Sequence, residues 1–157
     1  MESQHNYAIS QPSTGAARRR ARIEGSSSTS TSRGTILTVD DDSDNLTLLR
    51  LLLRSEGFEV LAAMSGPAAL QCVRQRMPDL IITDLTMPGM TGRELCRHLR
   101  EVNETRGIPI VVHTAETVPV TDPLYDRAFR KPADFNALLS TVYRLLAATR
   151  SEGVRSG

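Results

Sequence analysis

The 157-residue sequence contains no tryptophan, few other aromatic residues and only two cysteines. Cys72 and Cys96 both lie in segments with helical periodicity, so we expect buried free thiols rather than a disulfide or a metal site. No apolar run approaches the ~18 residues that a membrane-spanning helix needs. No cleavable hydrophobic region follows Met1. These absences argue against membrane and secreted classes, and we expect a cytoplasmic protein.

The charge is nearly balanced, at +1 overall, but it is unevenly distributed. Residues 1–34 carry five arginines against two glutamates and end in a run of serine and threonine. A segment without apolar periodicity buries too little surface to offset its ordering entropy, so we expect a disordered leader. Its arginines are the only feature that could contact nucleic acid, and we expect a solvated tether instead. Residues 151–157 are expected to form a tail.

From residue 35 to residue 150 the sequence alternates between apolar strand-like runs and amphipathic helical runs. Strands are expected near 35–39, 58–63, 79–83, 108–114 and 125–129. Helices are expected near 45–57, 65–77, 91–102 and 133–150. Uniformly apolar strands that alternate with helices indicate a parallel sheet covered on both faces. The predicted fold is therefore α/β, with one doubly wound five-stranded parallel sheet.

One crossover of this fold differs from the others. Only 16 residues separate Thr114 from Lys131, and they include Pro119 and Pro123. Proline inside a helix costs about 3 kcal/mol. We therefore expect a loop or a single turn where the fourth helix of such a fold would lie.

Chemically reactive side chains stand where the expected strands end. These residues are Asp40, Asp41 and Asp42, then Asp84, then Thr114, then Lys131. The carboxyl ends of parallel strands meet at one edge of the sheet, where ligands of such folds bind. Carboxylates without histidine or cysteine partners suit Mg²⁺. With a lysine and a hydroxyl beside them, they favour phosphoryl transfer onto a carboxylate.

The sequence resembles the receiver domain of two-component response regulators, which has a flavodoxin-like fold. The resemblance runs from about residue 35 to residue 148. It rests on the segments "ILTVDDD", "PDLIITDLTMPGMTG", "IPIVVHTAE" and "KPADFNALL". The 44 residues from Asp40 to Asp84 and the 30 from Asp84 to Thr114 are also similar to the family's spacing.

The resemblance implies a role for each matching residue. Asp84 would be the phosphoacceptor. Asp41, Asp84 and the backbone carbonyl of Thr86 would ligate Mg²⁺, and Asp40 would hold a metal-bound water. Thr114 and Lys131 would contact the phosphoryl oxygens.

Other positions receive lesser roles from the same resemblance. Asp42 would be peripheral, and Asp44 is expected at the start of a helix. Thr86 and Glu116 would tune dephosphorylation. The Lys131–Pro132 peptide bond would be cis.

One position departs from the family pattern. Where the family usually has an aromatic switch residue, this sequence has Ala128. Phe129 is adjacent, but neighbouring strand residues face opposite sides of a sheet, so it would not take over that role. We therefore expect phosphorylation chemistry to be retained, with output through an altered surface.

The implied function is a stand-alone receiver, not an enzyme, without an output domain of its own. It would take phosphate from a histidine kinase or a histidine phosphotransfer protein and signal by contact with a downstream protein. Two alternatives stay open: an intermediate that passes phosphate onward, and a degenerate receiver that acts as a scaffold. A dehalogenase-type phosphatase is disfavoured, because it needs a second aspartate at the position of Thr86.

Overall fold

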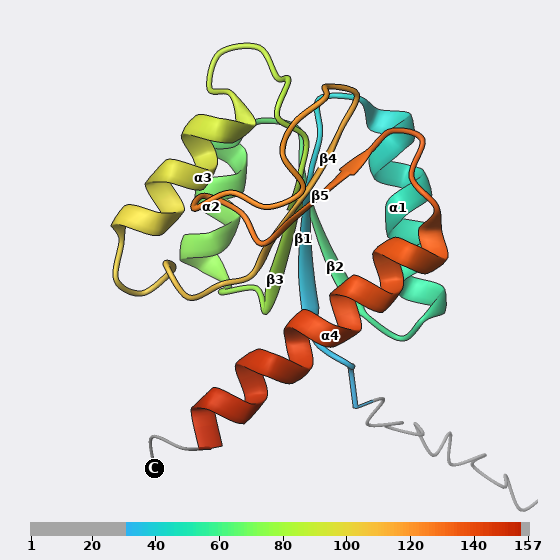
Figure 1. Cartoon of the computed structure of the whole chain (residues 1–157), viewed down its shortest axis with the longest axis vertical. Coiled ribbons are helices and arrows are strands. Elements are labelled where there is room, and N and C mark those ends of the chain that lie inside the picture. The colour runs from blue at the N-terminus through green and yellow to red at the C-terminus, as the bar shows by residue number, and fades with distance from the viewer. Residues whose placement is uncertain (1–30, 155–157) are drawn as a thin grey trace, which may run out of the picture. The chain divides into compact units, whose positions relative to one another are not determined.

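The computed structural model describes residues 31–154. Five parallel strands form one sheet in the order β2-β1-β3-β4-β5. The strands are β1 (Thr35–Val39), β2 (Glu59–Ala63), β3 (Leu80–Thr83), β4 (Ile110–Thr114) and β5 (Arg127–Arg130). The helices are α1 (Ser43–Ser55), α2 (Gly66–Gln75), α3 (Gly92–Glu101) and α4 (Phe135–Val154) (Figure 1). The predicted doubly wound α/β fold is confirmed.

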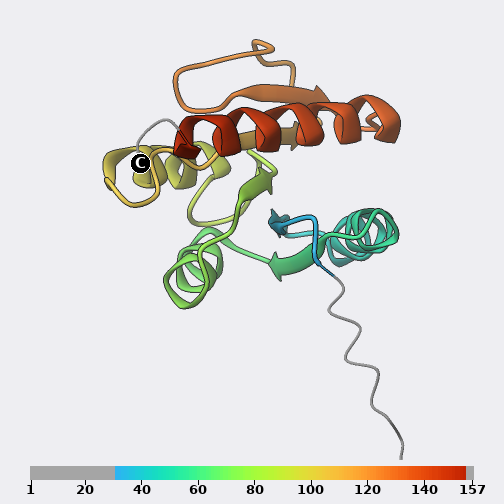
Figure 2. The ribbon, with the colours of Figure 1, turned by 90° about the horizontal axis from the view of Figure 1, so that it is seen from below.

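Helices cover both faces of the sheet because its central strands are apolar on both sides. Every residue of β1 is buried, and successive side chains point to opposite faces of the sheet, where they pack in two different cores. Ile36 packs in a core with residues of α1 and α4, whereas Leu37 packs in a core with residues of α2 and α3. Figure 2 shows the sheet between these two helical layers. The apolar residues of the central strands thus divide between two cores, one on each face of the sheet.

Three of the helices begin at capping side chains, two of which follow common sequence patterns. Ser65 caps α2, and Thr91 with Glu94 forms the capping box of α3. The third is Asp42, which caps α1 by accepting hydrogen bonds from the N–H groups of Asp44 and Asn45. Because Asp42 caps α1, the third aspartate after β1 has an explanation that is separate from the predicted metal site.

No helix forms between β4 and β5, where residues 115–126 are all described, as the two prolines predicted. Tyr125 fills the core at this position and is 2% exposed. Its hydroxyl donates a 2.8 Å hydrogen bond to the carbonyl of Pro119. The N–H of Ala128 donates to the carbonyl of Val120 at 2.8 Å, so part of the segment lies along the outer edge of β5. An ordered loop therefore takes the place of the helix.

The ends of the described region contact the domain. Arg33 donates its N–H to the carbonyl of Gly57 at 3.1 Å, and its guanidinium lies 5.7 Å from the ring centroid of Tyr143. Helix α4 continues to Val154, beyond the residue at which the sequence predicted a tail. Of the leader that the sequence predicted at residues 1–34, residues 1–30 lie outside the described residues, as do the tail residues 155–157.

Cys72 and Cys96 are free thiols, as predicted, but the predicted burial holds only for Cys96, because Cys72 is half-buried. Cys96 is fully buried, and burial raises the pKa of its thiol to about 11. Among the described helices, none combines the length and the apolar character needed to cross a bilayer.

Candidate phosphoacceptor site

Four predicted site residues meet at the carboxyl edge of the sheet. Asp40 follows β1, Asp84 follows β3, Thr114 ends β4 and Lys131 follows β5. The side chains of Asp40 and Asp84 are nearly buried, and Thr114 is fully buried. Groups that are distant in sequence are brought together because all the strands are parallel and end at the same edge.

Lys131 links the two buried carboxylates. Its Nζ lies 2.6 Å from Asp40 Oδ2 and 2.8 Å from Asp84 Oδ2. Lys131 is also the only lysine in the 157 residues, which contain eighteen arginines. An ammonium is a compact point charge that can move between oxygens, whereas a guanidinium is a rigid fork. The one lysine of the chain is therefore the counter-ion of the predicted phosphoacceptor.

The protonation states at the site follow from these contacts. Burial would raise the pKa of Asp84, but hydrogen bonds from Lys131 and from the Thr86 N–H favour the carboxylate and hold its pKa below the ordinary value. Burial would lower the pKa of Lys131, but its hydrogen bonds to the two aspartates raise it instead. At neutral pH the carboxylate of Asp84 is ionised and therefore able to act as a nucleophile.

The three carboxylates predicted to form the metal site, Asp40, Asp41 and Asp84, also lie together. One oxygen atom from each carboxylate lies within 4.8 Å of the others, and Asp41 is exposed while the other two are buried. Hard carboxylate oxygens with an open side suit Mg²⁺, which keeps several waters and takes few protein ligands. The donor set therefore fits this ion.

Thr86 and Glu116 meet across the opening of the site. The N–H of Thr86 donates a 3.1 Å hydrogen bond to Asp84 Oδ1, and the hydroxyl of Thr86 donates to Glu116. The N–H of Glu116 in turn donates to Thr114 Oγ1 at 3.3 Å. The loop after β3 is thus joined to the segment after β4. The role of the Thr86 carbonyl as a metal ligand stays a prediction.

The two residues at the altered switch position face opposite sides of the sheet. Ala128 packs in the core beneath α2 and α3, and Phe129 packs in the core beneath α1 and α4. The prediction that Phe129 would not occupy the place of the usual aromatic residue is confirmed. The Lys131–Pro132 bond is cis, as predicted.

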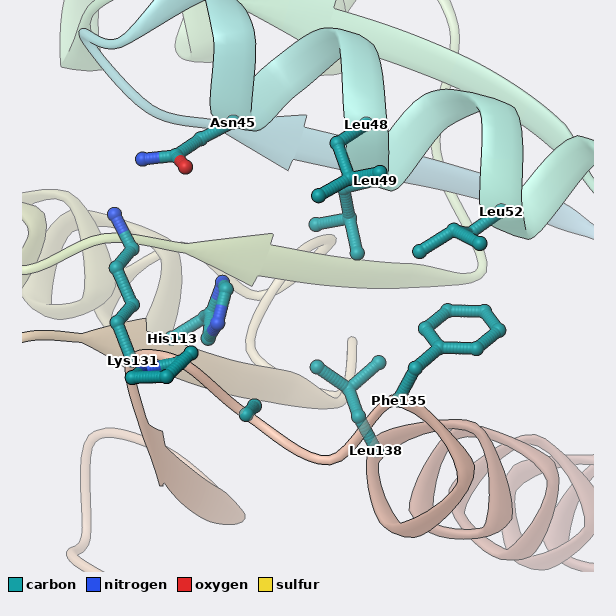
Figure 3. Close-up of a pocket in the computed structure, with 10 residues that line it drawn as sticks. Asn45, Leu48, Leu49, Leu52, His113, Lys131, Phe135 and Leu138 are labelled. Carbon is teal, nitrogen blue, oxygen red and sulfur yellow. The ribbon is translucent and has the colours of Figure 1, made fainter.

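A groove beside Lys131 was not foreseen from the sequence. It has a volume of about 300 Å³, lies between α1 and α4, and is walled mainly by leucines of α1, with Phe135 and Leu138 opposite (Figure 3). Lys131 and His113 lie at one end of it. A signal for His113 was present, because it is a titratable residue in an otherwise apolar strand, "IVVHT".

Comparison with known proteins shows which family this sequence resembles. The profile of the response regulator receiver domain matches residues 36–142. The DNA-binding response regulator MtrA of Mycobacterium tuberculosis is 45% identical over 87 residues, which are 55% of this chain and 37% of MtrA. The response regulator PleD of Caulobacter vibrioides is 46% identical over 80 residues, which are 51% of this chain and 18% of PleD. The chain thus spans well under half the length of these relatives.

Solved structures give the same fold. The signal receiver domain of a signal transduction histidine kinase from Syntrophus aciditrophicus is 32% identical, with a TM-score of 0.68, covering 73% of this chain and 91% of that one. The chemotaxis response regulator CheY4 of Vibrio cholerae is 30% identical, with a TM-score of 0.64, covering 71% of this chain and 97% of that one. With the family profile spanning more than half of the sequence, this chain belongs to the response regulator receiver domain family.

Proposed function

We propose that this protein accepts a phosphoryl group on Asp84 in a Mg²⁺-dependent reaction and signals by contact with another protein. The observation that carries the proposal is the Lys131 ammonium, bonded to Asp84 and Asp40 beside the three-carboxylate cluster. Its ammonium lies 2.8 Å from Asp84 Oδ2, close enough to contact the oxygens of a phosphoryl group attached to that residue.

The transfer step uses the side chains in separate roles. A carboxylate oxygen of Asp84 attacks phosphorus in line with the bond to the donor, the new O–P bond forms, and the donor group leaves with its bonding electrons. Mg²⁺, when held by Asp41, Asp84 and the Thr86 carbonyl with Asp40 on a bound water, supplies charge neutralisation for the phosphoryl oxygens. Lys131 moves one of its hydrogen bonds from a carboxylate oxygen to an oxygen of the phosphoryl group. The hydroxyl of Thr114, fixed at the end of β4, donates to another.

The proposed donor is a histidine kinase or a histidine phosphotransfer protein, and the groove between α1 and α4 is the surface that we propose for its docking. The groove is apolar, and it begins at Lys131 beside the phosphoacceptor. Leu48 on its wall is 59% exposed, so apolar area is available to a partner. A protein seated there can bring a phosphorylated histidine to Asp84.

The proposed output surface is the segment 115–126. It begins at Glu116, which is tied to the site through Thr86. A phosphoryl group on Asp84 adds negative charge close to the Glu116 carboxylate, which weakens that contact. With Ala128 in place of an aromatic switch, movement of this segment is the signal that we propose for the downstream protein.

The test is phosphorylation by acetyl phosphate with Mg²⁺, measured by intact mass. We expect the wild type to gain the mass of one phosphoryl group and Asp84→Asn to gain none. Asp42→Asn is the matched control, because asparagine caps a helix as well as aspartate does and Asp42 lies outside the carboxylate cluster. A wild type that gains no phosphate would show that the domain is a scaffold without phosphoacceptor chemistry.

A further inference from the structure

His113 is a polar side chain in the buried strand that carries Thr114. It pairs with Phe129 of β5, and its ring lies on the side of the sheet that α1 and α4 cover (Figure 3). Its Nε2 atom is buried and has no hydrogen-bond partner among the residues that the structure describes. A buried polar atom left unpaired costs about 1–3 kcal/mol. Nothing in the phosphoryl transfer described above uses this residue.

A small, partly enclosed cavity is lined by His113 and by the two buried carboxylates of the site. Its volume is about 10 Å³, which is room for the centre of one water molecule. Asp40, Asp84, Asn45 and His113 contribute the charged and polar side chains that line it, together with Thr38. A buried water needs two to four polar partners, and this lining provides them.

The charge state of His113 fits a donor role. Burial, reinforced by the positive charge of Lys131, lowers the pKa of the imidazole, so the ring is neutral at neutral pH. A neutral imidazole carries a proton on one nitrogen only. With the proton on Nε2, the ring can donate a single hydrogen bond toward the carboxylates, which can only accept.

We propose that one ordered water in this cavity bridges His113 Nε2 to the carboxylates of Asp40 and Asp84, and that His113 is a positioning residue of the acidic cluster. The water accepts from the Nε2 proton and donates its two hydrogens to the two carboxylates. All the polar groups concerned are then satisfied. The bridge fixes the carboxylates from the side of the core, while Lys131 holds Oδ2 of each carboxylate.

This inference rests on the proposed function, because the geometry that it explains is that of the proposed phosphoacceptor. Its consequence is specific. Removing the imidazole takes away one of the hydrogen-bonding links that orient the two carboxylates, which weakens Mg²⁺ binding without removing any metal ligand. Loss of one such hydrogen bond predicts a rise of about three- to tenfold in the Mg²⁺ dissociation constant.

The test compares His113→Leu with His113→Gln, which keeps an amide donor near the cavity. His98→Leu is the matched control, because His98 is an exposed histidine on α3 and does not line the cavity. Mg²⁺ affinity is measured by calorimetry, and thermal melts verify that each variant is folded. We expect weaker binding in His113→Leu, binding within about twofold of wild type in His113→Gln, and no change in His98→Leu.

A second readout needs neither metal nor phosphate. A high-resolution crystal structure of the metal-free wild type should show a water within hydrogen-bond distance of His113 Nε2, and ¹⁵N NMR should show the proton on Nε2. No water in the cavity, or a proton on Nδ1, overturns the inference, even if His113→Leu fails to fold.

The affinity results also separate the two proposals. Equal Mg²⁺ affinity in wild type and His113→Leu overturns the positioning role and leaves the proposed function intact. A wild type that binds no Mg²⁺ and takes up no phosphate overturns the proposed function, while the water is still tested by the metal-free structure.

Discussion

Lys131 Nζ lies 2.8 Å from Asp84 Oδ2, although the two residues are 47 positions apart in the chain. The contact joins the ends of β3 and β5 across the end of β4, which lies between them in the sheet. Because Lys131 also bonds Asp40, one ammonium bridges two buried carboxylates and offsets part of their negative charge. Two unit charges 4 Å apart interact by about 4 kcal/mol at an effective dielectric constant near 20. The lysine therefore allows the acidic site to exist in the absence of metal.

Because the chain has a single lysine, this contact can be observed directly. Labelling with ¹⁵N-lysine should give one side-chain ammonium signal, with a pKa above the ordinary lysine value because Asp40 and Asp84 stabilise the charged form once the cost of burial is met. Asp84→Asn removes one of the two carboxylates and should lower this pKa. An NMR pH titration of the two proteins measures both values.

The same shift has a consequence for stability. A pKa that is raised in the folded state contributes stability that is fully present below the unfolded value of about 10.4 and is lost as pH rises through the folded value. The wild type should therefore lose more stability than Asp84→Asn over this alkaline range, as followed by urea denaturation. A wild-type lysine that titrates at or below the ordinary value contradicts the ion pairs.

Gly92 allows α3 to pack directly on the phosphoacceptor main chain. A Cβ atom at this position would lie 1.8 Å from the carbonyl oxygen of Asp84, which is backbone and cannot rotate away. Gly92→Ala should therefore displace the loop after β3, cost about 1–3 kcal/mol of unfolding free energy and slow phosphorylation by acetyl phosphate. Denaturant unfolding and intact mass measure the two effects.

Gly107→Ala is the control for this prediction. No atom lies within 4 Å of a Cβ at Gly107. This variant should keep both the stability and the phosphorylation rate of the wild type. If Gly92→Ala does the same, α3 does not constrain the phosphoacceptor.

The sequence predicted the sheet because its signals were local and consistent. The runs "TILTV" and "IPIVVHT" are apolar on both faces, and Thr91 with Glu94 marks a helix start in four residues. The two prolines between Thr114 and Lys131 likewise excluded a helix, because proline disrupts a helix wherever it lies in the interior. The convergence of the acidic residues with Lys131 then followed from the parallel topology.

The rest depended on distances between segments that no local pattern contains. The groove between α1 and α4 depends on how far Phe135 stands from the leucines of α1. The close approach of Gly92 to Asp84 depends on the conformation of the loop between them, which no local sequence pattern specifies. The sequence predicts that Asp42 is peripheral to the metal site, and the structure shows that it is the N-cap of α1. Because the metal site already explained the acidic run after β1, the local N-cap signal of Asp42 was easy to miss.

Tyr125 holds the segment that replaces the fourth helix. Its ring is buried, and its hydroxyl donates to the Pro119 carbonyl within the same segment. Tyr125→Phe should cost about 1 kcal/mol for the lost hydrogen bond, and Tyr125→Ala about 3–5 kcal/mol for the cavity. Urea denaturation measures both. Tyr143→Phe is the matched control, because the hydroxyl of Tyr143 bonds the side chains of Glu56 and Arg33 and not the segment 115–126, so its loss should leave that segment in place.

Substitutions at Leu48 and Leu51 can distinguish loss of donor docking from loss of phosphorylation chemistry. Both leucines are exposed on α1, but only Leu48 lines the groove. Leu48→Glu places a charge on the proposed docking surface without touching the carboxylates or Lys131. We expect transfer from a phosphorylated histidine phosphotransfer protein to fall at least about tenfold, because burying an unpaired charge at an interface costs more than 1.4 kcal/mol. Phosphorylation by acetyl phosphate should keep its wild-type rate, since that small donor needs no docking surface. Leu51→Glu, with the same change of charge at a position that is 63% exposed, should transfer phosphate normally from both donors. If Leu48→Glu also transfers normally from the protein donor, the donor docks elsewhere and the groove is not its binding surface.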